Sequence, residues 1–140
     1  MKRHVRKGFC LIEMVIVILI LGIIAAVAAP RMFDTASKAE ENTTRQQLAV
    51  LRNAIEMYRA QNGSYPTDLP AAMQTMLNGP FPAPSIDPVR NLFGVLIDSN
   101  ADDTVPVVAT TDTTNGWAYK PINGSLKLNI SDVNTMGFDW

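Results

Sequence analysis

The side chains most often used in catalysis are scarce in this sequence. It has one histidine, His4, and one cysteine, Cys10, both near the N-terminus. A protein zinc site needs about four ligands, and a catalytic triad needs a histidine beside its nucleophile. The sequence therefore excludes zinc sites built from cysteine and histidine, and it excludes histidine-dependent hydrolases. No serine lies in a Gly-x-Ser-x-Gly context, so we expect no catalytic residues.

One acidic cluster in the sequence has the composition of a metal-binding loop. The oxygen-bearing side chains of Asp98, Asn100 and Asp102 follow the spacing of the first three ligands of an EF-hand. The sixth position is Asp103, where the EF-hand turn requires glycine, and the twelfth is Ala109, where the loop requires a glutamate. We therefore exclude an EF-hand. Two interpretations stay open: a looser calcium loop that uses the four oxygen-bearing residues, and a solvated acidic turn between two strands.

Glu13 is a carboxylate within an apolar run. It lies in Phe9–Ala29, where 19 of 21 residues are apolar. A charged side chain in a membrane helix costs about 2.5–3.5 kcal/mol on insertion scales, so such residues usually have a partner or a function. One interpretation is a carboxylate that reaches the headgroups near the helix end or is protonated. The other is an ion pair, for which cleavage just before Phe9 would create an amine on a neighbouring copy.

The apolar run Phe9–Ala29 is long enough to span a membrane as one helix. About 20 residues, at ~1.5 Å each, match a hydrocarbon core of ~30 Å. Because four basic residues precede the run, the positive-inside rule places the N-terminus in the cytoplasm and the residues beyond Pro30 outside. These four are Lys2, Arg3, Arg6 and Lys7. The alternative is a secretory signal cleaved after Ala28, which would release a soluble binding domain. The run is longer than the roughly 7–15 apolar residues of such signals, and Glu13 interrupts it.

The start of the chain closely resembles the prepilin leader of type IV pilins and type II secretion pseudopilins. The resemblance lies in residues 7–14, KGFCLIEM, and in the long apolar run that follows them; Cys10 and Met14 replace the commoner threonine and leucine. It implies that a peptidase on the cytoplasmic side cuts between Gly8 and Phe9 and methylates the new amine. It also implies that Glu13 neutralises the amine of Phe9 on an adjacent subunit during filament assembly.

The same resemblance implies the location and the partners of the protein. The chain would be a single-pass inner-membrane protein, with a cytoplasmic N-terminus and a periplasmic head, and would later enter an extracytoplasmic filament. Its partners would be a prepilin peptidase and methyltransferase, further copies of itself in a helical filament, and an inner-membrane assembly platform. Resemblance to pseudopilins of the G type, which are known for calcium in a loop of their β-region, keeps calcium as a candidate ligand.

A second amphipathic pattern predicts that the helix continues well beyond the apolar run. We expect one helix from Phe9 to about Asn62, kinked near Pro30, because proline removes a helical hydrogen bond. Its apolar stripe follows spacings of three, four and three: Leu48, Leu51, Ile55 and Tyr58. A solvated row recurs every seven residues: Arg45, Arg52 and Arg59. Gly63 and Pro66 favour a helix end, and residues 58–66 are similar to the helix-ending region of G-type pseudopilins.

The rest of the chain predicts short elements separated by turns. A short helix is expected at Leu69–Asn78, followed by a proline-rich extended loop at Gly79–Pro88. The expected strands are Leu92–Ile97, Val105–Thr110, Gly116–Lys120 and Ser125–Ile130. Two turn signals are Asn115-Gly116 and Asn123-Gly124, the second of which would close a hairpin. The apolar residues that alternate in the last two strands, and so predict one buried face, are Trp117, Tyr119, Leu126 and Leu128.

The expected fold class is α+β: a long kinked N-terminal helix, transmembrane in its first half, packed on a small three- to four-stranded antiparallel sheet, as in pilins. The division would be a leader peptide at 1–8, a membrane and filament-core half at 9–30, and a soluble head at 31–140.

Beyond the leader, the chain has eight basic and thirteen acidic residues, so we expect no nucleic-acid partner. The predicted function is a structural subunit of a type II secretion pseudopilus or a type IV pilus-like filament. A pseudopilus is favoured because the head is small and lacks a C-terminal cysteine pair.

Overall fold

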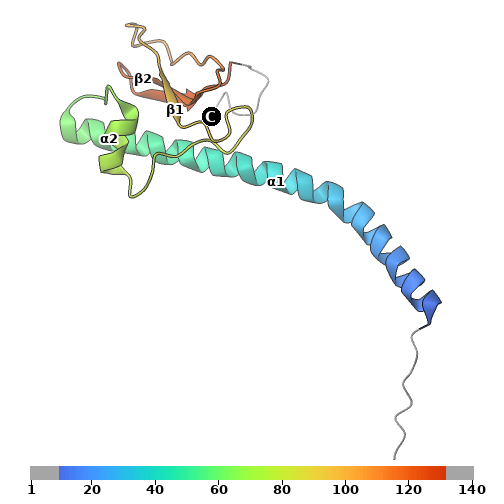
Figure 1. The fold of residues 1–140 in the computed structure, drawn as a ribbon. Helices are drawn as coiled ribbons and strands as arrows, with labels where there is room; N and C mark the ends of the chain where they lie inside the picture. The colour runs from blue at the N-terminus through green and yellow to red at the C-terminus, as the bar shows by residue number, and fades with distance from the viewer. Residues whose placement is uncertain (1–9, 132–140) are drawn as a thin grey trace, which may run out of the picture. The chain divides into compact units, whose positions relative to one another are not determined.

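The structure is a computed structural model that describes residues 10–131. Its elements, shown in Figure 1, are α1 (Leu11–Asn62), α2 (Leu69–Met76), β1 (Gly94–Ile97), β2 (Asn115–Lys120) and β3 (Ser125–Leu128). The expected α+β class is therefore confirmed. The chain divides into two units, residues 1–37 and 38–140, and α1 contributes to both.

The first unit contains the apolar start of α1. Every side chain from Cys10 to Ser37 is exposed, and the most apolar window of the helix has a mean hydropathy of 3.0. By length and composition, α1 is the one helix among residues 10–131 that could cross a membrane. It runs without interruption through Pro30 to Asn62, so the predicted continuity is confirmed, whereas the kink stays a prediction. Phe9, where the helix was expected to begin, lies outside the described residues.

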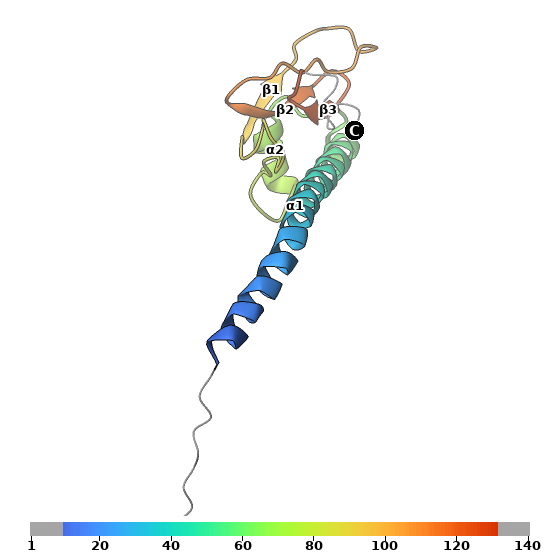
Figure 2. The same cartoon turned by 90° about the vertical axis from the view of Figure 1, so that its right-hand side faces the viewer.

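The second unit has a core between the later part of α1 and one face of the sheet. Leu48, Leu51 and Ile55 are buried, and Tyr58 is half-buried, as the apolar stripe predicts. They belong to one cluster with the four alternating residues of the sheet, Trp117, Tyr119, Leu126 and Leu128. Figures 1 and 2 both show the sheet and α2 beside this end of α1. The helix stripe and the sheet face are therefore two halves of one apolar core.

The polar atoms of the core aromatics are satisfied by the loops that surround it. The indole nitrogen of Trp117 donates to the carbonyl of Pro82 at 2.8 Å. The hydroxyl of Tyr119 donates to the carbonyl of Pro66 at 2.9 Å, and burial raises the pKa of this phenol. Large aromatic side chains are buried at low cost when their polar atoms find such partners. These two bonds hold the segments on either side of α2, at Pro66 and at Pro82, against the sheet.

One arginine of the predicted solvated row has a structural role. Arg45 and Arg59 are exposed, whereas Arg52 is half-buried. The guanidinium of Arg52 donates to the carbonyl of Leu126 in β3, through Nε at 3.2 Å and a terminal nitrogen at 2.9 Å. Its heptad spacing places it at the edge of the helix stripe, where a long side chain reaches the sheet. The prediction of a wholly solvated row is therefore wrong for this residue.

The short helix α2 is confirmed, although it ends at Met76 rather than Asn78. Asp68 caps its start by accepting a hydrogen bond from the backbone nitrogen of Ala71 at 3.2 Å. Leu69 and Met73 are buried in the core. The helix thus covers the end of the core near the turn that follows α1.

The sheet has three strands in the order β1-β2-β3. β2 and β3 form the predicted antiparallel hairpin, with Lys120 opposite Ser125 and with Gly124 at a φ of 71° in the turn. β1 is parallel to β2, so the expectation of an antiparallel sheet is wrong for this pair. The reason is that residues 98–114 return the chain to the starting end of β1 before β2 begins, and parallel strands require such a long connection.

The expected strand at Val105–Thr110 is wrong, because this segment is a loop. It packs on the second face of the sheet, where Val107 and Ala109 form a small cluster with Ala118. Its backbone nitrogens bond to side chains instead of a neighbouring strand. The acceptors are Ser125 Oγ for Val107 at 3.0 Å, Asp98 Oδ2 for Val108 at 3.1 Å and Asn129 Oδ1 for Thr110 at 2.8 Å. The alternating apolar pattern of the segment thus reflects burial, whereas its hydrogen bonds are irregular.

The turn signal at Asn115-Gly116 is also corrected, since both residues lie in β2. The preceding turn is made by Asp112, whose Oδ1 accepts hydrogen bonds from the backbone nitrogens of Thr114 at 2.7 Å and Asn115 at 2.6 Å. Gly116 is required for another reason: a Cβ there would meet the backbone of Leu92 and the ring of Pro84. Its glycine permits a close approach of two chain segments.

Replacing Leu51 with alanine should lower the free energy of unfolding of the head by about 2–5 kcal/mol, because the residue is fully buried and the cavity cannot close completely. The matched control is Val50→Ala. Val50 is the preceding residue of the same helix and is 50% exposed, so its substitution should change the free energy by no more than about 0.5 kcal/mol. Urea unfolding followed by Trp fluorescence measures both. Equal effects of the two variants would contradict the assigned core.

Candidate functional site

The first candidate residue, Glu13, lies in the first turn of α1. Its backbone nitrogen donates to the carbonyl of Cys10 at 3.0 Å. Its side chain is exposed, and within residues 10–131 no cation forms an ion pair with its carboxylate. A carboxylate in the first turn is favoured by the helix dipole. The predicted processing residues Gly8 and Phe9 lie outside the described residues, so the pairing of Glu13 stays a prediction.

An exposed apolar surface surrounds Glu13 and extends along α1. Its larger side chains are Leu11, Ile12, Met14, Val15, Ile16, Val17, Ile18, Leu19, Ile20, Leu21, Ile23, Ile24, Val27, Met32 and Phe33. Soluble monomers rarely expose contiguous apolar patches larger than a few hundred square ångströms, and larger ones mark contacts with a membrane or another protein. This segment therefore needs a non-aqueous neighbour all around its circumference.

The acidic cluster at the end of β1 forms a series of local turns. Asp98, Asn100 and Asp102 each accept, through Oδ1, a hydrogen bond of 3.0 Å from the backbone nitrogen two residues ahead. Asp102 Oδ1 also accepts from the Thr104 hydroxyl at 2.6 Å. Hydrogen bonds hold the pKa of both carboxyls below the usual range. The main donor is the backbone of Asn100 for Asp98, and it is Thr104 for Asp102. The side-chain oxygens thus organise the loop itself.

Calcium would need several of these oxygens to converge on one point. Among residues 10–131 no group of three or more His, Cys, Asp or Glu side chains is placed to hold a metal ion. The backbone carbonyls of Asp102 and Val105 accept hydrogen bonds from the ammonium of Lys120 instead. As they are arranged, Asp98, Asp102 and Asp103 do not form a three-carboxylate site, so this geometry gives no support to calcium at these residues and Asn100.

Lys120 is a residue that sequence reasoning missed. It is fully buried although it ends a strand and carries a charge. In β2 it shares a face with Gly116 and Ala118, and two small residues before it are the one signal that this face is covered. Lysine is almost never fully buried unless it is paired. The carbonyls that accept hydrogen bonds from Lys120 are therefore needed to keep it buried.

A bidentate ion pair ties the proline-rich segment to the beginning of the head. The terminal nitrogens of Arg90 donate to the two carboxylate oxygens of Glu40 in α1 at 2.9 and 2.6 Å, and Arg90 also contacts Asp87. The hydrogen bonds from Arg90 hold the pKa of Glu40 below its usual value. A second tie lies beside it, where the backbone nitrogen of Ser85 donates to the hydroxyl of Thr44 at 3.1 Å.

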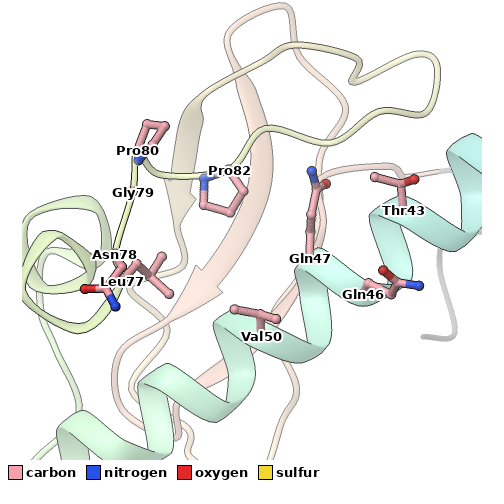
Figure 3. Close-up of a pocket in the computed structure, with 9 residues that line it drawn as sticks. All are labelled: Thr43, Gln46, Gln47, Val50, Leu77, Asn78, Gly79, Pro80 and Pro82. Carbon is pink, nitrogen blue, oxygen red and sulfur yellow. The ribbon is translucent and has the colours of Figure 1, made fainter.

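A shallow groove of about 390 Å³ lies between α1 and the segment that follows α2. Figure 3 shows its lining: Thr43, Gln46, Gln47, Val50, Leu77, Asn78, Gly79, Pro80 and Pro82. None of these side chains titrates in the physiological range, so the groove offers no general acid, general base or metal ligand. Its chemistry suits surface contact rather than catalysis.

These features define a class of protein: a pilin-like α+β chain with an exposed apolar helix and a small head. Residues 3–29 match the family model described as the prokaryotic N-terminal methylation motif. Residues 31–86 match the family model described as type II secretion system (T2SS), protein G. The resemblance to type II secretion pseudopilins that the sequence predicts is thereby confirmed.

Individual relatives agree with the two family models. The chain is 33% identical over 84 residues to type II secretion system core protein G of Aeromonas hydrophila, which covers 60% of this chain and 58% of that protein. It is 35% identical over 66 residues to the core protein G of Vibrio cholerae, with coverages of 47% and 45%. The chain spans about half the length of the curated relatives it matches. No solved structure gives a significant match.

Asp112 should make the head less stable at acidic pH. Hydrogen bonds from Asn115 and Thr114 hold the pKa of its carboxyl well below the usual value of 3.8. Its stabilising effect is therefore complete above the unfolded-state pKa and is lost as the pH falls through the folded-state pKa. Asp112→Asn should weaken the head at neutral pH and flatten the loss of stability between about pH 5 and pH 2.

Thermal unfolding of the two proteins across this pH range measures the effect. The control is Asp103→Asn, because the Asp103 side chain is exposed and, among residues 10–131, only its backbone carbonyl accepts a hydrogen bond. Its profile should run parallel to that of the wild-type chain. Parallel profiles for Asp112→Asn and the wild type would show that the turn before β2 does not depend on this carboxylate.

Proposed function

We propose that this protein is a structural subunit of a type II secretion pseudopilus or a closely related pilus-like filament. The observation that carries the proposal is the exposed apolar half of α1 with a carboxylate, Glu13, in its first turn. The match of residues 3–29 to the methylation motif supports it, as does the match of the following segment to the protein G model. The role is assembly rather than catalysis.

Processing would prepare the chain for assembly. A prepilin peptidase and methyltransferase at the cytoplasmic side would cut between Gly8 and Phe9 and methylate the new amine. The basic leader would keep the N-terminus in the cytoplasm, since positive residues resist translocation. The mature chain would then begin at Phe9 with a positively charged amine, four residues before Glu13 in the sequence.

Assembly would replace lipid with neighbouring helices around α1. The apolar side chains from Leu11 to Phe33 would pack against copies of the same segment in the filament core. Glu13 would pair there with the Phe9 amine of an adjacent subunit. In a low-dielectric environment an unpaired carboxylate is costly, and an opposite charge within hydrogen-bonding distance offsets part of that cost. The pairing would therefore select one axial register between neighbours.

The position of Pro30 is compatible with the same role. It lies where the apolar segment gives way to the polar part of α1, and its missing backbone donor weakens the helix locally. We infer that the helix bends here when the subunit passes from the membrane into the filament. The head would form the outer surface of the filament, and an inner-membrane assembly platform would drive the transfer.

Glu13→Ala should leave the amount of processed protein largely unchanged but reduce its recovery in filaments by about tenfold or more, because it removes the paired charge without shortening the apolar segment. The matched control is Glu41→Ala. Glu41 lies further along the same helix and pairs with Arg45 one turn later, and a single i,i+4 pair on a helix contributes only about 0.2–0.5 kcal/mol. Immunoblots of the sheared filament fraction and of whole cells measure assembly and processing separately.

Filaments at the wild-type level from Glu13→Ala would remove the pairing from the proposal. A defect of equal size in Glu41→Ala would show that the assay reports a general loss of the protein rather than the interaction at the start of α1.

A further inference from the structure

The second face of the sheet contains a buried cation. Lys120 ends β2 and is fully buried. Its ammonium donates hydrogen bonds to the carbonyls of Asp102 and Val105, the latter at 2.9 Å. Both carbonyls belong to the loop between β1 and β2, so one side chain from the sheet binds the loop at two points. An ammonium has three donors and no acceptor, and backbone carbonyls are the groups that can satisfy it.

The neighbouring side chain of Asn123 extends this arrangement. Its amide nitrogen donates to the carbonyls of Asp103 at 3.0 Å and Val105 at 3.1 Å. The backbone carbonyls of Asp102, Asp103 and Val105 therefore all point toward donors at the turn of the β2–β3 hairpin. A loop that binds a divalent cation also directs its oxygens inward around the ion. Here the positive charge belongs to the Lys120 side chain instead.

The carboxylates of the loop complete the electrostatic arrangement without contacting the ammonium. Hydrogen bonds within the loop are the main reason that the pKa values of Asp98 and Asp102 are low, and attraction to Lys120 lowers both further. The loop therefore has two nearby negative charges and one buried positive charge. A buried charge is costly unless its polar groups are satisfied. The Lys120 ammonium is hydrogen-bonded to two carbonyls, and the two carboxylates act on it at longer range rather than as a direct ion pair.

We propose that the ammonium of Lys120 is the structural cation of residues 98–110, so that the head is ordered without calcium. A calcium ion would bind the carbonyls of Asp102 and Val105 at about 2.3–2.6 Å. It would then lie within a few ångströms of an ammonium bonded to the same oxygens, and the repulsion between like charges opposes this. The Lys120 ammonium and a bound calcium ion would therefore exclude each other at the carbonyls of Asp102 and Val105.

The proposal predicts the behaviour of the full-length protein in detergent with calcium and with a chelator. The wild-type melting temperature and the hydrogen exchange of residues 98–110 should be the same in EGTA and in about 1 mM CaCl2, which equals the largest dissociation constants of extracellular calcium modules. Lys120→Met should lower the melting temperature by about 5–10 °C and speed exchange in this loop, because two buried carbonyls lose their donor.

The matched control is Lys127→Met, in the adjacent strand β3, where the side chain is only half-buried. It should leave exchange in residues 98–110 unchanged. A rise of more than about 2 °C in the wild-type melting temperature on adding calcium, or slower exchange of the loop with calcium, would overturn the proposal. If Lys120→Met does not fold, the calcium comparison on the wild-type chain still decides the question.

Discussion

The structure depends on one constraint: the first part of α1 cannot remain in water. Every side chain from Cys10 to Ser37 is exposed, and nearly all of those before Pro30 are apolar. Burial of apolar surface is worth about 25 cal/mol for each square ångström, so a membrane or a bundle of like helices is strongly favoured over solvent. In the proposed function the protein is first held in a bilayer and then extracted into a filament. Both states remove the apolar surface of this segment from water.

The second part of α1 has a different role, because its apolar stripe forms one side of the core of the head. Its stripe is buried against the sheet, and polar contacts fix the surrounding segments to it: Arg90 with Glu40, Ser85 with Thr44, and Arg52 with the backbone of β3. The head therefore has a core of its own and needs no help from the apolar segment to cover it. This division lets one continuous helix serve both a non-aqueous and an aqueous environment.

Sequence periodicity predicted most of the elements, because helix stripes and strand alternation follow directly from burial. It predicted the end of α1 at Asn62 and the buried face of Trp117 and Tyr119. It failed between β1 and β2, where side chains replace strand neighbours as hydrogen-bond acceptors, so Val107 and Ala109 alternate as in a strand but lie in a loop. It also failed for Lys120, since the small residues Gly116 and Ala118 on the same strand face do not by themselves distinguish a buried lysine from an exposed one. The direction of β1 depends on a long connection, which local patterns do not determine.

The central claim is that the apolar segment remains part of the mature protein and begins at Phe9. Mass spectrometry of the N-terminal peptide of the protein isolated from cells tests it most directly. The account predicts a mature chain that starts at Phe9 with a methylated amine, which places the amine within reach of Glu13 on a neighbouring copy. A mature chain that starts at Ala29 would contradict it, because the segment that needs a non-aqueous environment would have been removed as a secretory signal.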